Sequence, residues 1–157
     1  MSLAEAPTTV LAADDDEEDR LFLQEALAEA RLAETAYFVA DGAELMDYLY
    51  RRGPYAGARA GPRPDLILLD LRMPRKDGFE ALQEIKADAD LQRIMVVVLT
   101  SSQADDDLAR AYDLGASMFI TKPMTYSGLV NVLRVLGKYW QRLADLPRGR
   151  YGDEDGG

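Results

Sequence analysis

Residues 64–78 read PDLILLDLRMPRKDG, and this stretch indicates the fold class. Its four apolar residues, Leu66–Leu69, form a continuous run, which is typical of a strand buried on both faces of a parallel sheet. The other runs of this kind are residues 10–13, 95–99 and 118–120, with a weaker one at residues 36–40. Apolar residues at helical spacing fill the intervals between the runs. Strand and helix therefore alternate five times, and we expect a doubly wound α/β fold.

Length and composition limit what the chain can do. Its 157 residues have room for one domain, expected over residues 8–146, with a flexible acidic and glycine-rich tail at 147–157. Acidic residues number 28 and basic ones 18, and the net charge of −10 argues against binding nucleic acid or an anionic membrane. Cysteine and histidine are both absent, so any metal must bind to oxygen ligands. No apolar run approaches the ~20 residues of a membrane span, and we expect a cytoplasmic protein.

Polar residues follow the apolar runs at the points where the strands are expected to end. Ligands of an open parallel sheet bind beyond the carboxyl ends of its strands, so these residues are the candidates for a site. They are Asp14 and Asp15 after the first run, Asp70 after the third, Thr100 after the fourth and Lys122 after the fifth.

These residue types in combination favour phosphoryl chemistry. Carboxylates crowded together repel one another, and a divalent cation such as Mg²⁺ relieves the repulsion through oxygen ligands. Lys122 and Thr100 are suited to bind phosphoryl oxygens, one as a point charge and the other through its hydroxyl. The set predicts a site for a phosphoryl group on an aspartate.

Each of these residues also has a structural alternative. Asp70 could cap the following loop, and Thr100 and Lys122 could be ordinary strand-end and loop residues. The acidic residues 16–19 are interpreted as a solvated helix N-terminus, which the helix dipole favours, so that Asp14 and Asp15 alone are placed for metal. The joint occurrence of the candidates at the correct strand ends favours function.

Four motifs resemble the receiver domain of bacterial two-component response regulators. They are Asp14-Asp15, PDLILLDLRMPRKDG at 64–78, VVVLTSS at 96–102 and FITKP at 119–123. The resemblance implies a flavodoxin-like, five-stranded parallel sheet in the order 2-1-3-4-5 with helices on both faces. It also implies that the chain is a phosphoacceptor and not an enzyme, although it would assist its own phosphorylation and dephosphorylation.

The resemblance assigns a role to each matching position. Asp70 would be the phosphoacceptor. Asp15, Asp70 and the backbone carbonyl of Arg72 would bind Mg²⁺ directly, with Asp14 acting through water; Mn²⁺ or Ca²⁺ could substitute.

The switch residues follow from the same resemblance. Thr100 and Lys122 would bind the phosphoryl group, and Phe119 would be the switch aromatic, unless it is plain core. The Lys122–Pro123 peptide bond would be cis, a geometry confined almost entirely to bonds before proline.

Two further segments, 53–64 and 138–147, resemble single-domain regulators paired with bacterial phytochromes. The implied partner is a histidine kinase, and more narrowly a bacteriophytochrome. The last expected helix also carries two apolar stripes, one with Leu133 and one with Val132. The second stripe predicts a homodimer through the last two helices and the last strand. Alternatively, the tail folds back over that stripe.

Two other functions remain open. A phosphatase similar to the haloacid dehalogenases would also use an aspartyl phosphate, but Arg72 stands where that family has its second aspartate. A receiver-like scaffold that is never phosphorylated would work by binding alone. Labelling by acetyl phosphate with Mg²⁺, and its loss in Asp70→Asn, separates the three hypotheses.

Overall fold

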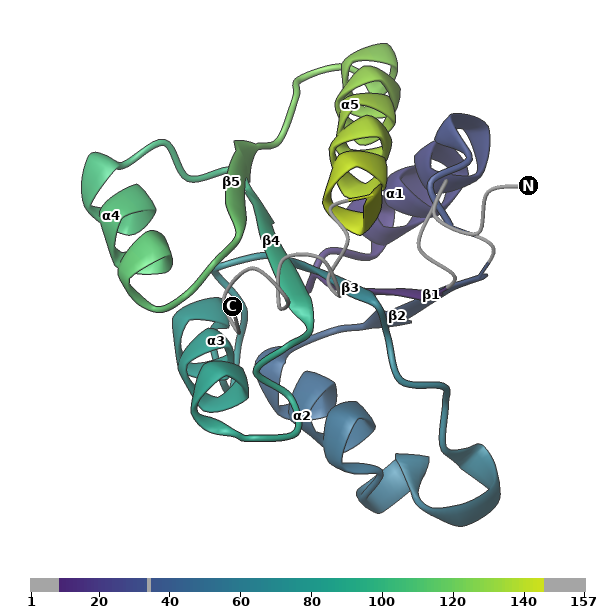
Figure 1. The fold of residues 1–157 in the computed structure, drawn as a ribbon, viewed down its shortest axis with the longest axis vertical. Coiled ribbons are helices and arrows are strands. Elements are labelled where there is room, and N and C mark those ends of the chain that lie inside the picture. Colours follow the sequence, from purple (N-terminus) through teal and green to yellow (C-terminus); the bar gives the residue numbers. More distant parts are fainter. Residues whose placement is uncertain (1–8, 34, 146–157) are drawn as a thin grey trace, which may run out of the picture.

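The fold is one open sheet of five parallel strands in the order β2-β1-β3-β4-β5 (Figure 1). It is seen in a computed structural model that describes residues 9–33 and 35–145, apart from the side chains of Arg59 and of 141–145. The strands are β1 (Thr9–Ala13), β2 (Thr35–Val39), β3 (Leu66–Leu69), β4 (Met95–Thr100) and β5 (Met118–Thr121). The predicted fold class and sheet order are therefore confirmed. The ends of the predicted domain, and the tail from 147, lie outside the described residues and stay predictions.

Helices cover both faces of this sheet (Figure 1). They are α1 (Glu17–Ala30), α2 (Gly42–Tyr50), α3 (Gly78–Ala87), α4 (Asp105–Asp113) and α5 (Tyr126–Asp145). One buried cluster lies between the sheet and α2, α3 and α4, centred on Phe79, and a second lies beneath α1 and α5, around Leu133. The loop expected before β3 contains two short 3-10 helices, η1 (Gly53–Tyr55) and η2 (Gly57–Arg59). No helix in the described part of the chain could cross a membrane.

Aspartates fix the starts of three helices next to the carboxyl edge of the sheet. The Asp16 side chain accepts a hydrogen bond from the backbone amide of Asp19 at the start of α1. The Asp41 side chain accepts one from the backbone amide of Glu44 at the start of α2. Asp77 begins α3 with a reciprocal capping box. These caps hold the loops that follow β1, β2 and β3 in defined positions.

Two glycines allow the loop after β3 to pack tightly. A Cβ atom at Gly78 would lie 2.2 Å from the carbonyl oxygen of Asp70, and one at Gly42 would lie 2.2 Å from that of Lys76. No real Cβ tolerates such a contact, so both positions require the missing side chain. The loop that carries Asp70 is thus held between the starts of α2 and α3.

Candidate phosphoacceptor site

The backbone of the site residues continues the ladder of the sheet. The amide of Asp70 donates to the carbonyl of Ala13 at 3.0 Å, and that of Lys122 donates to Thr100 at 2.7 Å. These bonds bring Asp14, Asp70, Thr100 and Lys122 to one edge, as the strand-end argument predicted. They surround a cavity of about 480 Å³ that is lined by Asp14, Asp15, Asp16, Asp19, Asp70, Arg72, Thr100, Ser101, Ser102 and Lys122.

Three carboxylates in this cavity are close enough to hold one metal ion. Asp14, Asp15 and Asp70 each offer an oxygen, and these atoms lie within 4.8 Å of one another. Asp14 and Asp70 are buried, whereas Asp15 is exposed. Burial raises the pKa of Asp14, and the hydrogen bond from Lys122 offsets only part of that effect. Carboxylate oxygens are ligands that Mg²⁺ prefers, so these three residues fit the predicted ion.

Lys122 is the internal counter-charge of these carboxylates. Its Nζ lies 2.6 Å from Asp14, 3.1 Å from Asp19 and 3.4 Å from Asp70. Burial by itself would lower the pKa of Lys122, but the bond from its ammonium to Asp14 and the charges of Asp70 and Asp14 outweigh burial and raise the pKa. The side chain therefore carries a full positive charge at neutral pH.

Asp19 belongs to the site, which corrects one interpretation. The sequence suggested that residues 16–19 merely form a solvated helix N-terminus. Asp16 is indeed the cap of α1, but Asp19 lines the cavity and its carboxylate accepts from Lys122. No sequence signal separates Asp19 from Glu17 and Glu18, because all three lie in the first turn of α1.

Thr100 is buried at the end of β4, with 1% of its surface exposed. Its Oγ1 accepts a hydrogen bond from the amide of Ser102 at 3.3 Å, which leaves the hydroxyl proton available for an acceptor in the cavity. Phe119 is half-buried and packs against the cluster beneath α2–α4. Its role as a switch stays a prediction.

The Lys122–Pro123 bond differs from the sequence-based expectation. Among the residues that the structure describes, no peptide bond is cis, so this bond is trans. The trans form is preferred before proline by about 0.5–1 kcal/mol. Lys122 reaches its three carboxylates from the trans form, so nothing in these contacts requires cis geometry.

Arg72 carries a contact that the sequence did not reveal. The Nη2 atom of Arg72 lies 2.7 Å from Oδ2 of Asp107 on α4, and Ser102 donates its hydroxyl to the same oxygen at 2.5 Å. The Ser102 hydroxyl, and with it Arg72, holds the pKa of Asp107 below its usual value. No sequence signal separates Asp107 from its neighbours Asp105 and Asp106, because all three lie in the first turn of α4.

Comparisons with known proteins agree with this geometry. The response regulator receiver domain family matches residues 10–134. The response regulator Rcp1 of Synechocystis is 36% identical over 141 residues, which cover 90% of this chain and 94% of Rcp1.

Solved structures give the same result. The phosphorylated cyanobacterial phytochrome response regulator RcpA superposes with a TM-score of 0.79 at 42% identity, covering 90% of this chain and 99% of RcpA. The Mn²⁺-bound form of Rcp1 gives a TM-score of 0.75 at 36% identity, covering 86% and 95% of the two chains.

Proposed function

Because the chain belongs to the response regulator receiver domain family, we propose that it is a phosphorylation switch in which Asp70 accepts a phosphoryl group from a histidine kinase. One observation carries this proposal. The oxygens of Asp14, Asp15 and Asp70 converge within 4.8 Å, and Lys122 faces the two buried members of that set.

Asp70 is the nucleophile in this scheme. Its Oδ1 accepts a hydrogen bond from the amide of Leu71 at 2.8 Å, which fixes the carboxylate with Oδ2 toward Lys122. Asp70 attacks phosphorus in line, the phosphorus–nitrogen bond of phosphohistidine breaks, and its electron pair returns to the imidazole of the kinase. Asp15, Asp70 and the backbone carbonyl of Arg72 would hold Mg²⁺ directly, with Asp14 acting through water, and the ion would supply positive charge beside the transferring group.

Lys122 and Thr100 respond to the new phosphoryl group. The ammonium of Lys122 pairs with a phosphoryl oxygen, and the hydroxyl of Thr100 donates to another. Motion of the loop after Thr100 lets Phe119 repack, which alters the surface of α4, β5 and α5. The same site hydrolyses the aspartyl phosphate slowly when water replaces the kinase.

The kinase partner is a bacteriophytochrome. Support comes from RcpA, which is a phytochrome response regulator and is 42% identical to this chain. The insert at 53–64, which suggested this partner, lies between α2 and β3 and includes η1 and η2.

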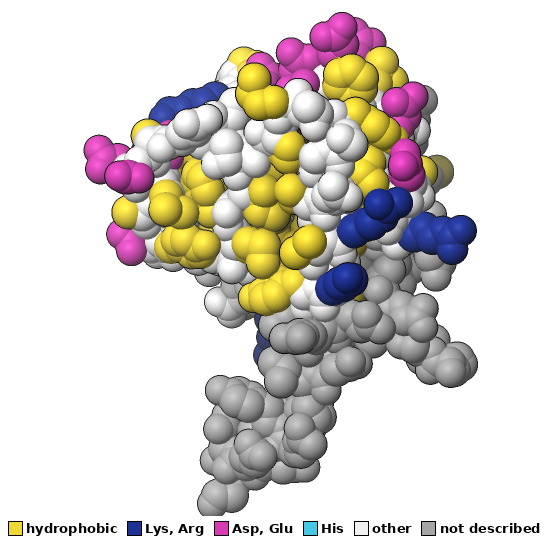
Figure 2. All heavy atoms as spheres, turned by 90° about the horizontal axis from the view of Figure 1, so that it is seen from above, with side chains coloured by type: hydrophobic (Ala, Val, Ile, Leu, Met, Phe, Trp, Pro, Cys, Tyr) yellow, Lys and Arg dark blue, Asp and Glu magenta, His cyan; other side chains and the backbone are white. Residues whose placement is uncertain are grey.

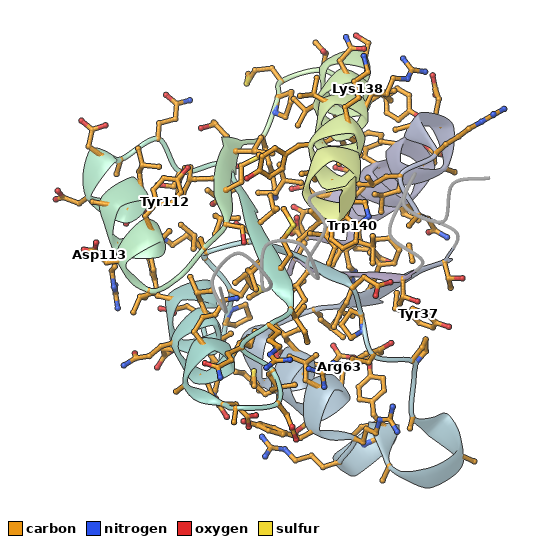
Figure 3. All side chains as sticks on the ribbon, viewed as in Figure 1. Tyr37, Arg63, Tyr112, Asp113, Lys138 and Trp140 are labelled. Carbon is orange, nitrogen blue, oxygen red and sulfur yellow. The ribbon has the colours of Figure 1, made fainter. Side chains whose placement is uncertain are left out.

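A homodimer through α4, β5 and α5 is part of the proposal. Figure 2 shows hydrophobic side chains gathered in the middle of this face, with acidic side chains at the left, along the top and at the upper right, and basic ones at the right and the upper left. Leu108 and Tyr112 on α4 and Val135 on α5 are exposed, Val135 by 64%. Figure 3 shows that Tyr112 and Asp113 lie across β5 from α5. Acidic α4 against basic α5 of a second copy suits a two-fold interface.

Phosphotransfer from a phytochrome-type histidine kinase, in light and in darkness, tests the function. We expect rapid Mg²⁺-dependent labelling of the wild type and of Asp113→Asn, an exposed control on α4, and none of Asp70→Asn. Labelling by acetyl phosphate but not by that kinase would retain the switch and refute the light-sensing partner. No labelling from either source would refute the switch, and turnover of added phosphate esters would indicate a phosphatase.

A further inference from the structure

Asp107 connects three segments around the phosphoacceptor cavity. Its carboxylate lies in the first turn of α4 and is buried, with 8% of the residue exposed. Oδ2 accepts from Arg72, which comes from the loop after β3, and from Ser102, which comes from the loop after β4. One carboxylate oxygen therefore ties α4 to both of the loops that carry Asp70 and Thr100.

The same contacts hold the start of α4. The N-cap residue of this helix is Ala104, whose side chain has no hydrogen-bonding group and cannot cap it. In place of a cap, the Ser102 hydroxyl accepts from the amide of Ala104 and donates to Asp107. Ser102 in turn donates its amide to Thr100 Oγ1, so a continuous chain of hydrogen bonds runs from Thr100 to Asp107 and ends at Arg72.

Arg72 can leave this chain of hydrogen bonds. Together with Lys122 it is one of two cations that line the cavity, and its side chain is 65% exposed, whereas that of Lys122 is 17% exposed. Its guanidinium lies over the ring of Phe79, with Cζ 5.6 Å from the centroid. Because most of the Arg72 side chain is exposed, reorientation breaks its 2.7 Å contact with Asp107 without withdrawing the guanidinium from the core, and Asp107 keeps its hydrogen bond from Ser102.

A phosphoryl group on Asp70 would compete with Asp107 for this guanidinium. A phosphoryl group carries up to two negative charges and three acceptor oxygens, and it matches the planar fork of arginine better than a single carboxylate oxygen does. We propose that Arg72 exchanges Asp107 for the phosphoryl group, so that phosphorylation releases the first turn of α4. This inference rests on the proposed function and adds to it that Arg72 links the phosphoryl group to the start of α4.

The test compares Asp107→Asn with Asp106→Asn, a matched control one residue earlier on the exposed side of the same turn. Beryllofluoride with Mg²⁺ serves as the phosphoryl mimic, and hydrogen exchange of the amides at 104–108 reports on the start of α4. We expect beryllofluoride to speed this exchange about threefold to tenfold in the wild type and in Asp106→Asn. Exchange in Asp107→Asn and in Arg72→Ala should already be fast without the mimic, and beryllofluoride should add no further increase.

The lifetime of the aspartyl phosphate separates an exchange from a merely structural contact. Asp107→Asn leaves Arg72 free to hold the phosphoryl group, so its lifetime should lengthen, whereas Arg72→Ala should shorten it, each by about threefold to tenfold. A contact that only steadied α4 would move both lifetimes in the same direction.

Two results would overturn the proposal. One is equal hydrogen exchange at 104–108 in Asp107→Asn and Asp106→Asn, with and without beryllofluoride. The other is a change in the lifetime of the aspartyl phosphate that has the same sign in Asp107→Asn and Arg72→Ala. A wild type that bound no beryllofluoride and accepted no phosphoryl group would instead refute the proposed function, and the exchange with it.

Discussion

The charge of a single residue, Lys122, decides whether three aspartates can lie together without a metal. Its ammonium contacts Asp14, Asp19 and Asp70, of which Asp14 and Asp70 are buried. Removing one member of such a set leaves the others as uncompensated buried charges, which costs more than the lost attraction alone. The site is therefore a source of local instability that only a cation offsets.

Replacement of this lysine should expose that instability. We expect Lys122→Met to lower the free energy of unfolding by about 3 kcal/mol in the absence of divalent ions, because the carboxylates lose their counter-charge. Mg²⁺ should stabilise the variant more than it stabilises the wild type, since binding to the folded state adds stability by mass action. Urea unfolding with and without Mg²⁺ measures both effects. Lys138→Met, at an exposed position on α5, is the control and should change neither.

Ionisation of Tyr48 should destabilise the folded protein at alkaline pH. Its hydroxyl donates to the carbonyl of Pro62 at 2.9 Å, and burial raises its pKa to about 12. The folded state holds this proton more tightly than the unfolded state, so the resulting stability is fully present below pH 10 and is lost as the pH rises to about 12.

Removal of the Tyr48 hydroxyl tests this prediction. Tyr48→Phe should cost about 1 kcal/mol at neutral pH through the lost hydrogen bond. Between pH 10 and 12 the free energy of unfolding of the wild type should fall by about 2 kcal/mol more than that of the variant. Urea midpoints at each pH measure the difference. A parallel decline in both proteins would contradict the assignment, and Tyr112→Phe, at an exposed tyrosine, should follow the wild type.

At the scale of the elements, the strands were predictable to the extent that both of their faces are buried. Every residue of β3 is buried, and its apolar run was clear in the sequence. The edge strand β2 is mostly half-exposed, so its run was weak. The two 3-10 turns at 53–59 were not predictable, because glycine and proline there indicate a loop without fixing its turns.

The site was predictable where it depends on strand ends and not where it depends on the packing of helices. Asp14, Asp70 and Lys122 directly follow their strands, Thr100 ends β4, and the four converge as the parallel arrangement requires. Asp19 and Asp107 are acidic residues in the first turns of helices, a position that the helix dipole favours in any case. Only the placement of α1 and α4 against neighbouring loops turns their carboxylates toward a partner.

The end of α1 offers a stabilising substitution. Arg31 follows this helix in the left-handed conformation, with a φ of 56°, which an L side chain adopts at a cost of about 1 kcal/mol. We expect Arg31→Gly to raise the free energy of unfolding by about 0.5–1 kcal/mol, because glycine accepts this conformation without strain. Urea unfolding of Arg31→Gly beside Arg31→Ala checks the cause. An equal gain in the alanine variant would show that charge, and not backbone strain, is responsible.

At the scale of the whole molecule, the apolar face of α4, β5 and α5 predicts concentration-dependent association. We expect the wild type to sediment as a dimer at high micromolar concentration. The double variant Tyr112→Ser/Val135→Ser should associate at least about tenfold more weakly, because it removes exposed apolar area from the face. Leu21→Ser, which removes an exposed leucine from α1, is the control. A monomeric wild type under these conditions would contradict the dimer.

The close contacts at Gly42 and Gly78 also constrain how this sequence can diverge. Any side chain at either position collides with the loop that carries Asp70, so a lineage descended from this protein can alter neither without rebuilding the loop. At Gly57, within the insert, an added Cβ atom would meet nothing within 4 Å, so a substitution there faces only the strain of a left-handed backbone with a φ of 63°. Sequence changes should therefore accumulate in the insert at 53–64 and not in the loop that carries Asp70. Proteins of this design can therefore acquire new binding partners while the candidate site stays unchanged.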